Sequence, residues 1–355
     1  MSLTLHVDAA RWRAGLSRTL DAQPTTVPVI KGNGYGFGRG VLAREATALG
    51  VDTIAVGTYA EVPAALTDFG SPDGDVLVLS PWRPFDDPDI ASATASERVI
   101  HTVGRVEDVA ALAARAPHAR IVLEGETSMS RHGLDRHELA AAVAALGDLR
   151  VEGFAIHLPL AGAGPADGHL REAESWAAAL ETSQLEATTL FVSHLSAVEL
   201  GTLASRRPGL TVRPRTGTSL WLGDLGALSV RARVLDRHTI GRGERIGYRQ
   251  RAVPRDGVLL VIDGGTSHGI GLEAPRDAGG VVGRGKTFAK GGLEAAGLTL
   301  SPFTIDGRQR WFAEPPHMHV SMVYVPAGVT APQVGDEVDV AVRFTTTTFD
   351  HVLLD

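Results

Sequence analysis

The stretch Val27-Pro-Val-Ile-Lys31-Gly-Asn-Gly-Tyr35-Gly-Phe-Gly38 is the most informative part of this sequence. A short apolar run typical of a buried β-strand ends in a lysine, and a glycine-rich loop follows. Lys31 is one of only three lysines in the 355 residues, and arginine supplies nearly all the other basic side chains. Desolvating an ammonium is costly unless it is paired, neutral or covalently bonded. A strand-end lysine therefore indicates a Schiff base to a carbonyl cofactor, the alternative being a lysine that extends to water.

The composition is that of an ordinary globular enzyme with room for about two domains. A net charge of −7 without a basic stripe argues against nucleic acid as a partner. The lack of cysteine excludes disulfides, thiolate nucleophiles and cysteine-ligated metals. The N-terminus has no signal-peptide pattern, and no apolar run is long enough to span a membrane. We therefore expect a soluble, cytoplasmic protein without a membrane partner.

Short β-rich runs alternate with helical segments over the first part of the chain. The β-rich runs are 26–31, 53–57, 76–80, 98–103, 120–124, 152–157, 189–194 and 210–215. Helical spacing of apolar residues marks 41–49, 106–116, 136–146, 169–181 and 196–206, while the helices after the third and eighth runs are weakly indicated. Alternation of eight strands with helices predicts a parallel sheet, and the number eight favours a closed (β/α)₈ TIM-like barrel.

The pattern changes after about residue 224, where helical spacing nearly vanishes. The β-like runs that replace it are 228–235, 258–262, 280–283, 317–325, 337–344 and 350–354. We therefore predict an α/β barrel domain at 8–223 and an all-β domain at 224–355. The first strand, within 1–7, is expected to pair into the β domain.

Functional residues of a (β/α)₈ barrel lie at the C-terminal ends of its strands. The polar residues at these ends are Lys31, Glu124 or Glu126, His157, Ser193, His194, Arg213 and Arg215. Ser196 opens the helix after the seventh strand, and Gly217 and Thr218 open the turn after the eighth. The corresponding loops of this fold bind phosphate through backbone N–H groups. A lysine on the first strand that faces such loops predicts pyridoxal phosphate as the cofactor.

The segment Ile30-Lys31-Gly-Asn-Gly-Tyr35-Gly resembles the cofactor-lysine motif V-K-A-N-A-Y-G-H-G of the alanine racemases, pyridoxal-phosphate enzymes of fold type III. The similarity extends over nearly the whole chain and is strongest at such motifs. It implies that Lys31 bonds to pyridoxal phosphate and serves as one of two catalytic bases. It also implies that Tyr35 holds the phosphate.

Two further barrel motifs are similar to those of the family. Glu124-Gly-Glu-Thr-Ser-Met-Ser-Arg131-His-Gly resembles K-x-D-T-G-M-x-R-x-G, which implies that Arg131 lies near the phenolic oxygen of the cofactor and the substrate carboxylate. Gly153-Phe-Ala-Ile-His157 places His157 at the family's strand-six histidine. Where the family has a lysine, often carbamylated, Glu124 supplies negative charge directly, in a supporting role toward Arg131.

The phosphate end and the pyridine nitrogen have counterparts on the last two strands. Ser196 aligns with the phosphate-binding serine, and Arg215-Thr-Gly217-Thr218 resembles R-x-G-I. The resemblance implies that Arg215 bonds the pyridine nitrogen and that the amides after it bind phosphate. We expect Arg215 to face into the barrel, and Arg213, on the same strand, to face outward.

The β domain contains two more matches. Arg245-Ile-Gly-Tyr248 is similar to V-S-Y-G, whose tyrosine is the second catalytic base and crosses the interface of a homodimer. Met322 falls where the family places a substrate-binding backbone. The resemblance implies an isomerase, a racemase that interconverts L- and D-amino acids by two-base transfer of the α-proton. Alanine is the default substrate, and a larger or more polar amino acid is the alternative.

Three other positions depart from the family. Phe349 replaces a tyrosine that contacts the phosphate, Val323 replaces the aspartate of M-D, and His268 lies within the counterpart of G-Y-A-D-G. These changes bear on substrate choice and turnover more than on cofactor binding.

Two alternative functions remain. His317-Met-His319 resembles the metal site of D-threonine aldolases and D-serine dehydratases, lyases with this barrel and cofactor. Two histidines at i and i+2 of one strand face the same side and would bind zinc. The other alternative is a non-catalytic pyridoxal-phosphate-binding protein, against which the two-domain length and Tyr248 argue.

Overall fold

The computed structural model describes residues 2–160, 167–185, 187–272 and 299–355. Packing divides the chain into two compact units. The barrel unit comprises Arg13–Gly34 and Gly38–Gly223, and the β unit comprises Met1–Trp12, Tyr35–Phe37 and Asp224–Asp355. Each unit contains one eight-stranded sheet.

The barrel unit has the predicted parallel sheet, and the sheet is closed. Its strands, in chain order, are β2 (Val27–Pro28), β3 (Thr53–Val56), β4 (Asp75–Val78), β5 (Val99–Val103), β6 (Arg120–Gly125), β7 (Arg150–Ile156), β8 (Thr189–Val192) and β9 (Thr211–Thr216). Each strand pairs with the next from β3 to β9, and β9 pairs with β2. A parallel bridge between Val29 and Ala55 joins the end of β2 to β3 and completes the ring. The predicted (β/α)₈ barrel is thereby confirmed.

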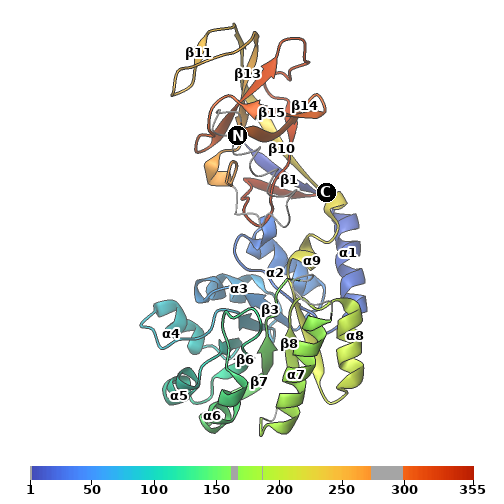
Figure 1. The fold of residues 1–355 in the computed structure, drawn as a ribbon, viewed down its shortest axis with the longest axis vertical. Coiled ribbons are helices and arrows are strands. Elements are labelled where there is room, and N and C mark those ends of the chain that lie inside the picture. The colour runs from blue at the N-terminus through green and yellow to red at the C-terminus, as the bar shows by residue number, and fades with distance from the viewer. Residues whose placement is uncertain (1, 161–166, 186, 273–298) are drawn as a thin grey trace. The chain divides into compact units, whose positions relative to one another are not determined.

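Helices alternate with these strands and lie around them (Figure 1). They are α1 (Ala9–Ala22), α2 (Arg39–Ala48), α3 (Val62–Asp68), α4 (Pro88–Thr94), α5 (Val106–Arg115), α6 (Leu139–Ala144), α7 (Gly168–Thr182), α8 (Ala197–Arg206) and α9 (Thr218–Trp221). The two weakly indicated helices, α4 and α9, have only 7 and 4 residues. Short helices show little apolar periodicity, and local capping specifies α4, whose preceding Asp87 accepts N–H groups of the first turn.

The barrel interior is filled by apolar side chains from successive strands. They are Val27, Val29, Ala55, Leu77, Ile100, Val122, Ala155 and Phe191. Arg213 also points inward, because its guanidinium carbon lies 5.6 Å from the centre of the Phe191 ring while it pairs with Asp52. The prediction that Arg213 faces outward is wrong. Residues two apart on a strand project to the same face, so Arg213 and Arg215 enter the barrel at different levels.

The β unit is an antiparallel barrel with an added strand pair. Its main strands are β1 (Leu3–Val7), β10 (Leu228–Ile240), β13 (Gly257–Asp263), β14 (Leu300–Ile305), β15 (Arg308–Phe312), β16 (Val320–Pro326), β17 (Glu337–Val340) and β18 (His351–Leu354). The order β13-β16-β15-β14-β17-β10 closes because β10 also pairs with β13. Strand β1 runs antiparallel to β10 and parallel to β18. Both the all-β domain and the pairing of the first strand into it are therefore confirmed.

Two hairpins of the β unit were not predicted. Strands β11 (Arg245–Ile246) and β12 (Arg251–Ala252) form a short one. Strands β14 and β15 form the other, in which Ile305 pairs with Arg308 across Asp306-Gly307. The Asp-Gly pair has φ values of 54° and 70°, as a tight hairpin turn requires, and it was the available sequence signal. The predicted run 280–283 lies outside the described residues.

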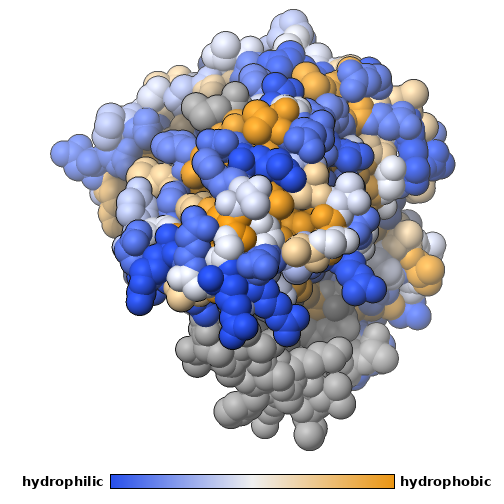
Figure 2. Space-filling view, turned by 90° about the horizontal axis from the view of Figure 1, so that it is seen from above, coloured by the Kyte–Doolittle hydropathy of each residue, from blue (hydrophilic) through white to orange (hydrophobic). Residues whose placement is uncertain are grey.

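The surface is predominantly hydrophilic on the face shown in Figure 2, where apolar side chains occupy small areas between polar ones. In the described part of the chain, the helices are too short or too polar to traverse a lipid bilayer.

Candidate active site

Lys31 directly follows the buried residues Val27–Ile30 at the C-terminal end of β2, and the loop after it has a fixed backbone. Gly34 has a φ of 62°, and a Cβ at this residue would lie 2.6 Å from the backbone nitrogen of Arg39. Only glycine fits this position. The glycine in this loop thus allows the backbone conformation that follows Lys31.

A buried carboxylate secures the backbone beside Lys31. Glu61, in the 3₁₀ helix η2 (Tyr59–Glu61), accepts the N–H of Gly32 at 2.9 Å and the N–H of Gly57 at 2.7 Å. Gly32 follows Lys31, and Gly57 follows β3, so Glu61 ties the ends of two neighbouring strands together. Glu61 was not predicted from the sequence, because no local pattern around it indicates a contact with a residue 29 positions away.

The electrostatic surroundings of Lys31 favour its neutral form. Burial lowers the pKa of its ammonium most, the positive charges of Arg131 and Arg215 lower it further, and Glu61 raises it. The lysine residue as a whole is nevertheless exposed, unlike the strand before it. A lysine with a lowered pKa is a better nucleophile near neutral pH, as Schiff-base chemistry requires.

Arg131 is presented by a loop that closes on itself after β6. The backbone of Leu134 bonds back to the strand end. Its N–H donates to the backbone carbonyl of Glu124 at 2.8 Å, and its carbonyl accepts the N–H of Glu126 at 2.9 Å. Gly133, at φ 125°, passes so close to this strand end that a Cβ would lie 2.2 Å from the Glu126 nitrogen. Arg131 itself is exposed, and its charge acts on Lys31 and on His157.

Glu124 and Arg215 are both buried, and they act on each other through their opposite charges. Burial raises the pKa of Glu124, while Arg215 acts on it more strongly than any other cation and lowers it. Burial lowers the pKa of Arg215, and Glu124 raises it. Within the described chain, neither Arg215 nor Arg131 is hydrogen-bonded to the Glu124 carboxylate, and both act on it through charge. Of the two, Arg215 has the stronger effect.

Each partner of this pair retains one unsatisfied polar atom. An Nη atom of Arg215 donates to the carbonyl of Ile156 at 2.8 Å. Its Nε, and Oε2 of Glu124, are buried without a hydrogen-bond partner among the described residues. Buried polar atoms are seldom left unpaired, so a donor at this position indicates a polar ligand atom.

Two histidines follow strands β7 and β8. Oγ of Ser193 lies 2.9 Å from Nδ1 of His157, and the rings of His157 and His194 meet edge to face at 5.1 Å. Burial lowers the pKa of His157 to about 3, helped by the charges of Arg215 and Arg131 among others. His157 is therefore neutral at pH 7, and its imidazole offers a flat, uncharged surface in the site.

The predicted phosphate-binding residues lie at two helix starts. Ser196 is the N-cap of α8, where its side chain accepts the N–H of Glu199 and its hydroxyl donates to the Glu199 carboxylate at 2.7 Å. Its hydroxyl therefore caps the helix. Gly217 precedes the one-turn helix α9, which begins at Thr218.

Three predicted site residues belong to the β unit. Tyr35 is buried with a φ of 53°, and Tyr248, in the β11–β12 hairpin, is 85% exposed. Met322 lies in β16, and its carbonyl accepts the N–H of Ala313 at 2.8 Å. In the barrel unit, Lys31, Arg131, His157 and Arg215 lie close enough for their charges to influence one another. Tyr35, Tyr248 and Met322 belong to the β unit.

Of the three departures from the family pattern, Phe349 and Val323 are buried and His268 contacts a carboxylate. Phe349 is buried beside Gly36, where a Cβ would lie 2.9 Å from its ring. Val323 is fully buried. His268 lies with Nε2 3.3 Å from a carboxylate oxygen of Asp350.

The histidine pair proposed for zinc does not lie on one strand. His317 and His319 precede β16, which begins at Val320, and lie in a turn in which the His317 N–H donates to the Val320 carbonyl at 2.9 Å. His317 bonds Glu314 at 2.7 Å, whereas the ring of His319 faces His268. In the described ranges, no cluster of three or more His, Cys, Asp or Glu side chains would hold a metal. The predicted geometry of this site is wrong.

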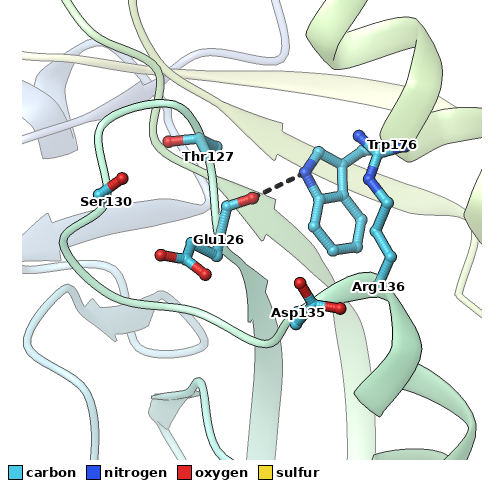
Figure 3. Close-up of a pocket in the computed structure, with 6 residues that line it drawn as sticks. All are labelled: Glu126, Thr127, Ser130, Asp135, Arg136 and Trp176. Carbon is cyan, nitrogen blue, oxygen red and sulfur yellow. Dashed lines mark hydrogen bonds between the residues drawn. The ribbon is translucent and has the colours of Figure 1, made fainter.

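A polar pocket of about 310 Å³ is lined by residues of the segment after β6 and by Trp176 of α7 (Figure 3). Trp176 forms one wall and donates its indole N–H to the carbonyl of Glu126 at 3.0 Å. Arg136 stacks over this indole at 4.8 Å. Glu126 thus points to a cavity beside the loop, which leaves Glu124 as the strand-end carboxylate of the candidate site.

Comparison with known sequences agrees with the motifs. Residues 8–218 match the family described as alanine racemase, N-terminal domain. An alanine racemase of Nitratidesulfovibrio vulgaris (strain Miyazaki F) is 32% identical over 146 residues, which is 40% of this chain and only 39% of that protein. The alanine racemase of strain DP4 is 26% identical over 266 residues, 70% of this chain and 69% of that protein.

Solved structures share the architecture at lower identity. Alanine racemase from E. faecalis superposes with a TM-score of 0.72 and 16% identity, covering 99% of this chain and 98% of that one. Alanine racemase from Bartonella henselae, solved with covalently bound pyridoxal phosphate, gives a TM-score of 0.68 and 18% identity over 96% of this chain and 91% of that one. These similarities establish the barrel plus β-domain fold.

Proposed function

The chain belongs to the alanine racemase family through its N-terminal domain, and on that basis we propose that it is a pyridoxal-phosphate-dependent amino-acid racemase. The observation that carries the proposal is the grouping of Lys31 with Arg131, Arg215 and His157 at the C-terminal end of a closed (β/α)₈ barrel. A lysine of lowered pKa amid cations suits covalent capture of an anionic aldehyde.

The residues present fit the cofactor. Lys31 would hold it covalently, and the buried Nε–H of Arg215, which lacks a partner in the described chain, suits the pyridine nitrogen. The neutral ring of His157 would pack on the cofactor, while Tyr35, Gly217 and Thr218 would hold its phosphate. Ser196 would join them when its N–H and hydroxyl leave the Glu199 carboxylate, to which both donate in this structure. Bound pyridoxal phosphate would supply the electron-withdrawing group that acidifies the α-hydrogen of an amino acid. Arg215 has no acceptor atom, so it would leave the pyridine nitrogen unprotonated and limit side reactions.

Two side chains would move the proton. Nζ of Lys31 and Oη of Tyr248 act on opposite faces of the substrate, so that one removes the α-proton while the other delivers a proton to the opposite face. In this proposal the protein is a homodimer, and Tyr248 acts in the site of the partner subunit, as its 85% exposure permits. Arg131 would bind the substrate carboxylate, Met322 would contact the substrate through its backbone, and Glu124 would support Arg215.

Solvent exchange tests this function directly. Protein loaded with pyridoxal phosphate is incubated in D₂O with single L- and D-amino acids, beginning with alanine and continuing to larger and more polar ones. We expect α-deuterium uptake together with loss of enantiomeric excess, and neither with Lys31→Arg. Absence of exchange with every amino acid would overturn the proposal, whereas release of ammonia or aldehyde without racemisation would identify a lyase.

A further inference from the structure

A buried carboxylate in the β unit lies next to the proposed catalytic tyrosine. Glu314 is only 6% exposed, and its two oxygens have different donors. Oε2 accepts the backbone N–H of Tyr248 at 2.9 Å, and Oε1 lies 2.7 Å from Nε2 of His317. One carboxylate therefore holds both the hairpin backbone and an imidazole.

The imidazole in turn contacts the phenol. The ring centres of Tyr248 and His317 lie 4.6 Å apart, with planes inclined at 41°. Tyr248 is otherwise 85% exposed, so His317 gives an exposed side chain a packing surface. The bond to Glu314 fixes the ring orientation of His317, since Nε2 must face the carboxylate.

The hairpin backbone is adapted to this contact. Gly247 has a φ of 70°, and a Cβ at this residue would lie 2.1 Å from a Glu314 oxygen. Any other residue would displace the carboxylate or the hairpin. Gly247, Glu314 and His317 thus together determine the surroundings of Tyr248.

We propose that Glu314 and His317 are positioning residues for Tyr248, holding the phenol in the orientation needed for proton transfer. This inference rests on the proposed function, in which Tyr248 is one of two bases. The carboxylate fixes the hairpin through a backbone bond, and the imidazole restricts the rotamers of the tyrosine. A base held in place loses less entropy on reaching the reactive geometry.

Separate measurements of exchange and inversion distinguish positioning from a general loss of activity. In Glu314→Leu and His317→Leu, we expect racemisation to fall by about tenfold, less than the roughly 10²–10⁴-fold that loss of the base itself would cost. The α-hydrogen of one enantiomer should still exchange with D₂O, because Lys31 would remove and return it on the same face. The ratio of exchange to racemisation should therefore rise for that enantiomer. Glu314→Gln, which can still accept from Tyr248 and bond His317, should restore most of the racemisation.

Amide hydrogen exchange tests the contact without substrate or cofactor. The peptide that contains Tyr248 should exchange faster in Glu314→Leu than in the wild type or Glu314→Gln. The control is His238→Leu, an exposed histidine beside Asp236 in the same unit, which should change neither measurement.

The outcomes separate the two proposals. If the wild type racemises but exchange and racemisation fall equally in both leucine variants, or neither falls, the positioning role is overturned and the proposed function stands. Unchanged amide exchange in Glu314→Leu would also overturn it. If the wild type neither racemises nor exchanges, the function fails and the catalytic role of this cluster fails with it.

Discussion

The backbone N–H of Gly32 donates to the carboxylate of Glu61 at 2.9 Å, immediately after Lys31 in the chain. This bond places a negative charge next to a lysine whose other charged neighbours, Arg131 and Arg215, are cations. Burial and these arginines lower the pKa of Lys31, and Glu61 partly offsets them. The glutamate therefore influences both the position of the lysine and its protonation.

Neutralising Glu61 should lower the pKa of Lys31 further. In Glu61→Gln, more of the neutral amine is present at a given pH, so the rate at which Lys31 captures pyridoxal phosphate should rise at a lower pH than in the wild type. Stopped-flow absorbance across the pH range measures this rate. Glu45→Gln is the matched control, because Glu45 is equally buried but pairs with Arg13. An unchanged or higher transition pH would contradict the prediction.

Lys31 should be the residue that borohydride fixes to pyridoxal phosphate. Reduction of the loaded protein converts a Schiff base to a stable amine, so peptide mass spectrometry should find a pyridoxyl group on Lys31. Lys31→Arg should remove this label, because the guanidinium of arginine stays protonated and offers no neutral amine to form a Schiff base. Labelling confined to Lys286 or Lys290 would refute the assignment.

Removing Arg215 should destabilise the barrel strongly. Arg215→Leu leaves Glu124 as a buried carboxylate without the cation that acts on it most strongly, so the free energy of unfolding should fall. Adding Glu124→Leu should recover much of that loss, since both buried charges are then gone. Urea unfolding measures the free energies. Arg213→Leu is the control, because its partner Asp52 is largely exposed and such pairs contribute about 0–1 kcal/mol. A double variant as unstable as Arg215→Leu would contradict the coupling.

Acid should destabilise the protein through His101. The His101 ring is buried 3.1 Å from the Tyr59 hydroxyl, and burial lowers its pKa to about 4. The unfolded chain, with an ordinary histidine pKa of about 6.5, binds the proton first as the pH falls. The loss of unfolding free energy caused by His101 is absent above about pH 6.5 and grows as the pH falls. It is complete near pH 4, where it reaches roughly 3 kcal/mol.

The pH dependence of His101→Gln checks this sign. The variant should lose less unfolding free energy than the wild type between pH 7.5 and pH 5, as urea titrations at each pH would show. His238→Gln, at an exposed histidine, should keep the wild-type slope. An equal loss in all three proteins would refute the assignment to His101.

Tyr248→Phe should reduce racemisation by about 10²–10⁴-fold, the usual contribution of a general base, while capture of pyridoxal phosphate by Lys31 is unchanged. Polarimetry and cofactor absorbance measure the two properties. Tyr324→Phe is the matched control, because that hydroxyl donates to the backbone carbonyls of Arg255 and Asp256. Equal losses in both variants would point to stability of the β unit.

Sequence reasoning succeeded where the signal was local and periodic. All eight barrel strands were predicted, because a strand in a barrel with helices outside is apolar on both faces. It failed at β14 and β15, where the Asp306-Gly307 turn was overlooked. It also failed for Arg213, which shares a face with Arg215 because side chains on a strand repeat every two residues. It failed for His317 and His319 because they lie in a turn before β16.

The amino-acid pattern was enough to predict the alternation of strands and helices, and with it the end of the barrel at which Lys31, Arg131, His157 and Arg215 lie. All strands of a (β/α)₈ barrel are parallel, so residues at their C-terminal ends meet at one end of the barrel. Three contacts became visible only in the folded chain: Glu61 binds the backbone beside Lys31, Glu124 acts on Arg215, and Glu314 joins His317 to Tyr248. These contacts join residues on different elements, and a single polar side chain carries no periodic signal that names its distant partner.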